Sequence, residues 1–190
     1  MGFKEALGSL LGSTALPKAN LDKLFAISAA SITMQSEFDM KPAPTAGICF
    51  KPVESSEFDA AKKEIEELLS FSSRETGSIA RLVTDEYHFT WVILEDPDFD
   101  DLVTGMHLVS QTLIEKGFGD YLLCAIFRFE GLHPLFWIYN FKQGRYYPFI
   151  PLPDKKRDTA AEFRMKALLE KELPVEKDAG MWYPLWGIPL

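Results

Sequence analysis

Cysteine is scarce in this sequence, and its spacing encodes no common metal or redox site. Only two of the 190 residues are cysteines, Cys49 and Cys124. Neither belongs to a Cys-x-x-Cys motif, which excludes a zinc knuckle and a thioredoxin-type redox pair. Each lies within an apolar run, so we expect both to be small buried hydrophobic residues in a reducing compartment.

Long apolar runs and targeting segments are also missing. No stretch approaches the roughly 18 apolar residues of a membrane-spanning helix. The uncharged run from Ala6 to Leu16 follows Glu5 and is diluted by glycine, serine and threonine, which makes a poor signal peptide. The sequence therefore favours a cytoplasmic protein. Residues 1–11 are nearly uncharged on one side, which suits peripheral contact with the inner face of the cell membrane.

Motifs for phosphate binding and nucleophilic catalysis do not occur. The sequence has no Gly-x-x-x-x-Gly-Lys, Gly-x-Gly-x-x-Gly or Gly-x-Ser-x-Gly pattern. We therefore expect no cofactor, no metal ion and no catalytic residue, and the sequence favours a non-enzyme. An acid–base pair of His107 with Glu95 or Asp96 stays open. It would belong to an alternative, a small-ligand-binding or hydrolytic domain with a pocket in the aromatic sheet.

Basic residues are outnumbered, and the imbalance is local. The chain has 20 lysine and arginine residues against 28 aspartate and glutamate residues, a formal net charge of −8. This charge disfavours nucleic acid as a partner. Between Glu54 and Asp101 there are 14 acidic and 4 basic residues, so the excess negative charge lies in this part of the chain. We expect such an acidic surface to steer a basic partner toward the protein.

Apolar and aromatic residues are plentiful, at 47% and 13% of the chain, enough for a real hydrophobic core. Strands and helices are expected in clusters, without regular β-α-β alternation. This order predicts a single α+β domain, an antiparallel or mixed β-sheet with several helices packed against it. We assign residues 1–17 to a short amphipathic helix and linker, 18–176 to the domain, and 177–190 to an apolar aromatic tail.

Hydrophobic periodicity places the individual elements. The expected strands cover residues 29–35, 45–50, 79–84, 89–94, 121–129, 134–141 and 145–150. The expected helices cover residues 20–25, 56–70, 96–117 and 159–172. Their boundaries rest on a turn at Pro42–Pro44, a loop over 71–78, an N-cap at Asp96, and a capping box of Thr159 with Glu162.

Two segments carry the candidate partner-binding residues. Apolar residues at helical spacing near the start, and aromatic residues near the end, suit contacts with another molecule. These candidates are Phe3, Leu7, Leu10, Trp182, Tyr183 and Trp186. Two structural roles stay open beside partner binding. The N-terminal helix can pack on its own domain or on a second copy, in a homo-oligomer, and the tail can close the core.

Several phrases occur in an order that resembles one known family. They are Phe50-Lys51-Pro52-Val53-Glu54, the run Leu94–Val103, Tyr139-Asn140-Phe141-Lys142, Tyr147-Pro148-Phe149 and Trp182-Tyr183-Pro184-Leu185-Trp186-Gly187. Together they resemble PspAB, the PspA-associated protein family, over nearly the whole chain.

The resemblance implies a function but no site. It implies a non-enzymatic accessory or adaptor protein of a prokaryotic envelope-stress response, the phage-shock response. Its implied partners are a PspA-like protein or an HtpX-type membrane protease. No catalytic residues are established for the family, so the resemblance transfers none to this sequence.

Overall fold

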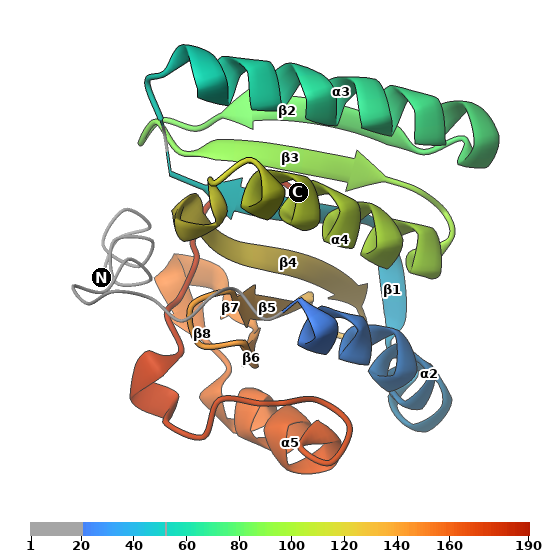
Figure 1. Cartoon of the computed structure of the whole chain (residues 1–190). Coiled ribbons are helices and arrows are strands. Elements are labelled where there is room, and N and C mark those ends of the chain that lie inside the picture. Colours follow the sequence, from blue (N-terminus) through green and yellow to red (C-terminus); the bar gives the residue numbers. More distant parts are fainter. Residues whose placement is uncertain (1–20, 52) are drawn as a thin grey trace.

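A six-stranded antiparallel sheet organises the protein in a computed structural model, which describes residues 21–51 and 53–190 (Figure 1). The strands stand in the order β2-β3-β1-β4-β5-β6, and each pairs antiparallel with its neighbour. Their bounds are β1 Lys41–Phe50, β2 Ile79–Thr84, β3 Thr90–Glu95, β4 Leu122–Glu130, β5 Leu135–Asn140 and β6 Arg145–Phe149. A small hairpin of β7 (Pro151–Leu152) and β8 (Lys156–Arg157) follows.

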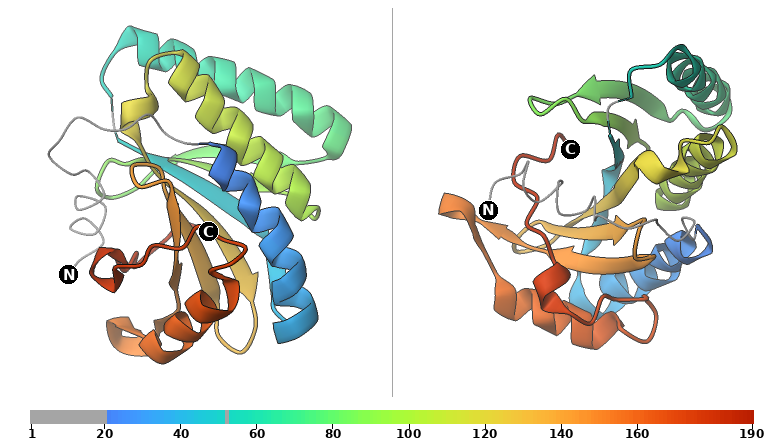
Figure 2. Two further views of the ribbon diagram at one scale, coloured as in Figure 1. Left: turned by 60° about the horizontal axis from the view of Figure 1, so that its bottom comes forward. Right: turned by 60° about the vertical axis from the view of Figure 1, so that its left-hand side comes forward.

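Helices cover one face of this sheet. The α-helices of the described residues are α2 Ala26–Phe38, α3 Ser56–Thr76, α4 Phe99–Glu115 and α5 Thr159–Leu169, and short 3-10 turns occur at Asp22–Phe25, Gly119–Tyr121, Pro153–Lys155 and Ala179–Met181. Helices α2, α3 and α4 lie side by side on one face, while the C-terminal segment crosses the other (Figure 2). Helix α5 lies near β6. The architecture confirms the expected α+β fold, and no helix of the described residues is long and apolar enough to cross a membrane.

Helix α4 packs closely on the sheet at Gly105, which has no side chain. A Cβ atom added at Gly105 would lie 2.5 Å from Cδ1 of Leu94 on β3, so any larger residue there would force the Leu94 side chain to shift. The two cysteines confirm their expected burial: Cys49 on β1 lies opposite Cys124 on β4, and both have no exposed surface. Burial raises the pKa of the Cys49 thiol well above its ordinary value.

The strand expected over 29–35 is wrong, because these residues belong to helix α2. The buried positions Ile27, Ala30, Ser31 and Met34 recur at helical spacing and face the sheet. The indole N–H of Trp137 donates to the sulfur of Met34 at 3.1 Å, which fixes the helix against β5.

Four other expected boundaries are corrected. The segment Pro42–Pro44 lies inside β1, where the pairing with β4 is irregular, because proline cannot donate to a ladder. Residues 71–76 continue helix α3 instead of forming a loop. The N-cap of α4 is Asp98, not Asp96. The N-cap of α5 is Asp158, so Thr159 and its partner form no capping box.

Candidate partner-binding surfaces

The C-terminal segment packs on the sheet face opposite the helices. Trp182 and Leu185 are buried, with 3% and 1% of their surfaces exposed. The ring of Trp186 meets that of Phe149 edge-on, with centroids 5.0 Å apart. Cδ2 of Leu190 lies 3.0 Å from the position that a Cβ atom on Gly47 of β1 would take. This segment therefore closes the second face of the core.

The three predicted tail residues consequently differ in what they offer a partner. Trp182 is buried, and its indole N–H donates to the carbonyl oxygen of Glu176 at 3.1 Å. Tyr183 and Trp186 are half-buried and keep part of their surface in solvent. The hydroxyl of Tyr183 donates to the sulfur of Met181 at 3.3 Å. Phe3, Leu7 and Leu10 lie outside the described residues, as does the whole segment 1–11.

A buried ion pair anchors the C-terminal segment. The carboxylate of Glu162 on α5 is fully buried and accepts from the Nε of Arg157 at 2.8 Å and from the backbone N–H of Ile150 at 2.8 Å. The guanidinium of Arg157 also donates to the carbonyl oxygen of Trp182 at 2.8 Å. Burial raises the pKa of Glu162, although the hydrogen bonds from Arg157 and Ile150 act to lower it. This pair therefore joins α5, the end of β6 and the C-terminal segment.

The acidic part of the chain forms the opposite end of the sheet. Helix α3, strand β2 and the turn after β2 span residues 54–86, with nine acidic and four basic residues and thus a net charge of −5. Two of the acidic side chains are paired: Asp59 with Lys62 at 2.7 Å, and Glu64 with Lys116 at 2.6 Å. Glu57, Glu66 and Glu67 are exposed on α3, which leaves an acidic helix surface beside the edge strand β2.

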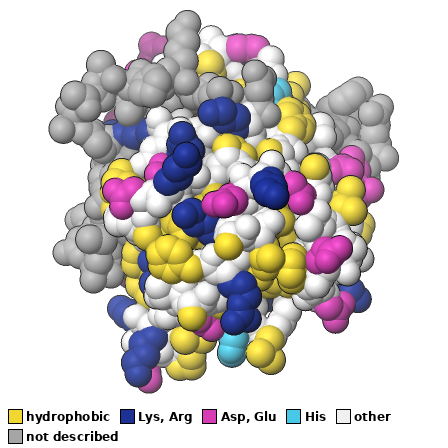
Figure 3. All heavy atoms as spheres, turned by 90° about the horizontal axis from the view of Figure 1, so that it is seen from below, with side chains coloured by type: hydrophobic (Ala, Val, Ile, Leu, Met, Phe, Trp, Pro, Cys, Tyr) yellow, Lys and Arg dark blue, Asp and Glu magenta, His cyan; other side chains and the backbone are white. Residues whose placement is uncertain are grey.

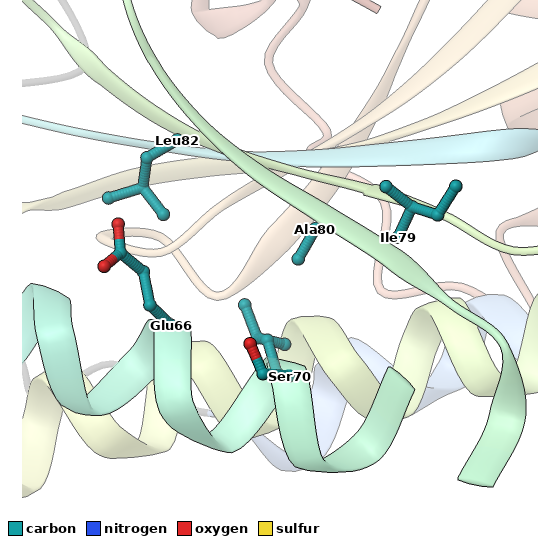
Figure 4. Close-up of a pocket in the computed structure, with 6 residues that line it drawn as sticks. Glu66, Ser70, Ile79, Ala80 and Leu82 are labelled. Carbon is teal, nitrogen blue, oxygen red and sulfur yellow. The ribbon is translucent and has the colours of Figure 1, made fainter. Parts of the chain in front are cut away.

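A groove runs between α3 and β2 (Figure 4). One cavity of about 420 Å³ is lined by Glu66, Leu69, Ser70, Ile79, Ala80 and Leu82. A second of about 450 Å³ is lined by Asp59, Lys62, Lys63, Glu66, Leu82, Thr84 and Thr90. Because Glu66 and Leu82 line both cavities, the two form one groove along the length of β2. Its lining is mixed polar and apolar at the Ile79 end and mainly polar at the Thr84 end.

A third hollow lies at the far end of the molecule, beneath α5. Its volume is about 460 Å³, and its lining includes Met40, His133, Arg164 and Met165. Leu132, in the turn between β4 and β5, also lines this hollow and is 95% exposed. Figure 3 shows this face, where hydrophobic side chains gather among scattered basic and acidic side chains. The charged side chains on this face are of both signs, unlike the excess of acidic residues over 54–86 at the other end of the sheet.

The residues of the acid–base alternative are not brought together. The ring of His107 packs on that of Phe25, with centroids 4.6 Å apart. Asp96 lies at the other end of α4, where it accepts from the backbone N–H of Asp98 at 2.7 Å and from the hydroxyl of Ser78. At 1.5 Å per residue, the nine residues from Asp98 to His107 span about 13 Å of helix. Within the described part of the chain, no three His, Cys, Asp or Glu residues cluster as a metal site.

The aromatic residues of the sheet are core residues. Trp137, Tyr139, Tyr146 and Tyr147 have no exposed surface. Burial raises the pKa of the Tyr147 hydroxyl well above its ordinary value. The three cavities described above lie at the α3–β2 edge and beneath α5, and none of them is lined by these aromatic rings.

Two parts of this arrangement escaped the sequence analysis. The ion pair of Arg157 and Glu162 was not predicted, because Glu162 was assigned to a capping box with Thr159. The sequence of β2 does contain a signal of an edge that can pair with another strand. Residues 79–84 contain no proline and no glycine, and only one of them is charged. Edge strands usually carry such protective residues, but strand order decides which strands lie at an edge.

The fold and these surfaces define the class of the protein: a single α+β domain with a buried aromatic sheet, an acidic edge and exposed hydrophobic side chains. The chain belongs to the PspAB family, described as PspA associated protein B, whose family model matches residues 1–190. Searches of curated proteins and of solved structures find no match.

Proposed function

We propose that this protein is a non-enzymatic accessory protein of a phage-shock-like envelope-stress response, which acts by binding a PspA-type protein. The observation that carries this proposal is the family match over the whole chain, because the family is named for its association with PspA. In this proposal the protein works in the cytoplasm, at the inner face of the cell membrane. An HtpX-type membrane protease is the second candidate partner.

The structure offers two kinds of surface for such contacts. The acidic region 54–86 can orient a basic partner at a distance, because charge complementarity mainly raises the rate of encounter. Exposed apolar side chains can then contribute most of the affinity, as large hydrophobic and aromatic anchors do in other interfaces. Tyr183 and Trp186 are half-buried candidates of this kind. Residues 1–11 stay a proposed contact with the membrane or with a second copy.

The direct test is affinity capture of the tagged full-length protein from its own cells, with the membrane fraction included and mass spectrometry as the readout. The proposal predicts enrichment of a PspA-type protein over a capture with the tag alone. Enrichment of an HtpX-type protease without a PspA-type protein would assign a different partner. Absence of both, from bait whose circular dichroism spectrum shows a folded protein, would contradict the proposal.

A further inference from the structure

Strand β2 leaves one edge of the sheet open. Among the strands of residues 21–51 and 53–190 it pairs with β3 alone. Its register with β3 is continuous, without a bulge, and Ile79 is 60% exposed. The opposite edge is protected, because β6 contains Pro148 and its residue Tyr146 exchanges backbone hydrogen bonds with Pro174 and Glu176. Natural proteins usually protect sheet edges as β6 is protected, with proline or with further backbone pairing.

The hydrogen-bond pattern shows which backbone groups of β2 face outward. The N–H of Asp85 donates to the carbonyl oxygen of Phe89, directly after the last pair of the β2–β3 ladder. In an antiparallel ladder, hydrogen-bonded and non-hydrogen-bonded pairs alternate. Counting back along β2, the N–H and C=O groups of Ala80, Leu82 and Thr84 therefore point away from β3, toward the open edge.

The groove beside this edge can receive the side chains of an added strand. The side chains of Ala80 and Leu82 face α3, and Figure 4 shows Glu66 and Ser70 of the helix directed toward them. An added strand would place alternate side chains in this groove. The small side chain of Ala80 leaves room there, Leu82 supplies an apolar wall, and the exposed carboxylate of Glu66 makes no ion pair with any described residue.

Charge decides between two possible occupants of this edge, a segment of a partner protein and a second copy of this protein. The charged residues that line the groove balance, with Asp59 and Glu66 against Lys62 and Lys63, but residues 54–86 as a whole carry a net charge of −5, which attracts a basic segment. A second copy of this protein would place two such acidic regions side by side, which like-charge repulsion opposes. In an added strand that alternates basic and apolar residues, one kind of side chain points into the groove and the other kind points to the opposite face.

We propose that the open edge of β2 and its groove bind an extended, basic segment of a partner protein, which adds to the sheet as a further strand. Backbone hydrogen bonds to Ala80, Leu82 and Thr84 supply affinity, and the groove selects alternate side chains. The inference rests on the proposed function only in requiring a protein partner, and its test uses a model peptide instead of PspA.

The probe is a capped peptide of alternating lysine and valine residues, about as long as the six residues of β2. Binding to the full-length protein is measured by NMR titration and amide hydrogen exchange. We expect new protection at the amides of Ala80, Leu82 and Thr84. The variant Ala80→Pro removes one outward N–H without breaking the β2–β3 ladder, and should weaken binding by about tenfold.

Two further variants keep the test decisive if Ala80→Pro fails to fold. Glu66→Lys should weaken binding of the lysine peptide and strengthen binding of a matched glutamate–valine peptide. Leu132→Lys, which changes an exposed leucine far from the groove, is the control and should bind like the wild type.

Three results would overturn the inference. The first is peptide binding without protection at β2, and the second is no detectable binding. The third is concentration-dependent protection of β2 without peptide, which would assign the edge to a second copy. If the peptide binds as expected and PspA does not, the edge inference stands and the proposed partner is wrong.

Discussion

Replacing Glu162 by alanine removes the carboxylate that joins α5, the end of β6 and the C-terminal segment. The backbone N–H of Ile150 then loses its acceptor, and the guanidinium of Arg157 loses its charged partner. Leaving a buried donor unpaired costs about 1–3 kcal/mol. Removing one member of a buried ion pair costs about 3–5 kcal/mol in total.

The lower end of that range applies here. Arg157 keeps its hydrogen bond to the carbonyl oxygen of Trp182, and its side chain is 22% exposed. We therefore expect Glu162→Ala to lower the free energy of unfolding by about 3 kcal/mol. Glu162→Gln is the matched control, because an amide oxygen can still accept from Ile150. The amide also keeps the length and packing of the side chain, so the glutamine variant should lose less stability than the alanine variant, about 1 kcal/mol relative to the wild type.

The sign of the pH dependence follows from the raised pKa of Glu162. The folded state binds the Glu162 proton more tightly than the unfolded state, whose pKa is near the ordinary value of 4.5. The contribution of this group to stability is therefore greatest below that value and falls as pH rises through the raised pKa of the folded state. As pH rises from about 4.5 through the raised pKa of the folded state, the wild type should lose stability relative to Glu162→Gln.

Urea unfolding followed by tryptophan fluorescence measures both effects, at several pH values on wild type and variants. The reasoning would be refuted if Glu162→Ala stayed within about 0.5 kcal/mol of the wild type, which is the range of ordinary surface substitutions. It would also be refuted if the glutamine variant were as unstable as the alanine variant, or if the difference between wild type and glutamine variant changed with pH in the opposite direction.

Three other predictions concern the core. Gly105→Ala should lower the free energy of unfolding by about 1–3 kcal/mol through contact with Leu94, and Leu94→Ala in the same chain should lose less than the sum of the two single changes. The thiols of Cys49 and Cys124 should react with a thiol reagent only as fast as the protein unfolds, since both are buried; rapid reaction of the folded protein would contradict this burial. Trp182→Ala should lower the free energy of unfolding in urea by about 3–5 kcal/mol, because its side chain is buried; loss of binding at unchanged stability would instead make it a partner contact.

Local sequence patterns predicted well the strands that pair with their neighbours in sequence. The hairpin β2–β3 and the meander β4–β5–β6 lie within a residue or so of their expected positions. Both are built from strands that neighbour each other in sequence, so turn residues and apolar runs were enough to place them. The alternative role of the tail, closing the core, agrees with the burial of Trp182 and Leu185.

Tertiary context decided the elements that were missed. Residues 29–35 contain β-branched Ile32 and Thr33, which favour a strand, but packing of Met34 against Trp137 holds them in a helix. The open edge of β2 depends on the strand order, because β1 lies between β3 and β4 although it precedes both in the sequence. Local periodicity contains no information about such long-range pairing.

The most direct test of the proposed function is isothermal titration calorimetry of the purified full-length protein with purified PspA from the same cells. The account predicts saturable binding with a Kd of about 1 μM or tighter at low salt, weakening as salt screens the acidic region 54–86. Absence of binding at concentrations up to roughly 100 μM, with both proteins folded, would contradict it.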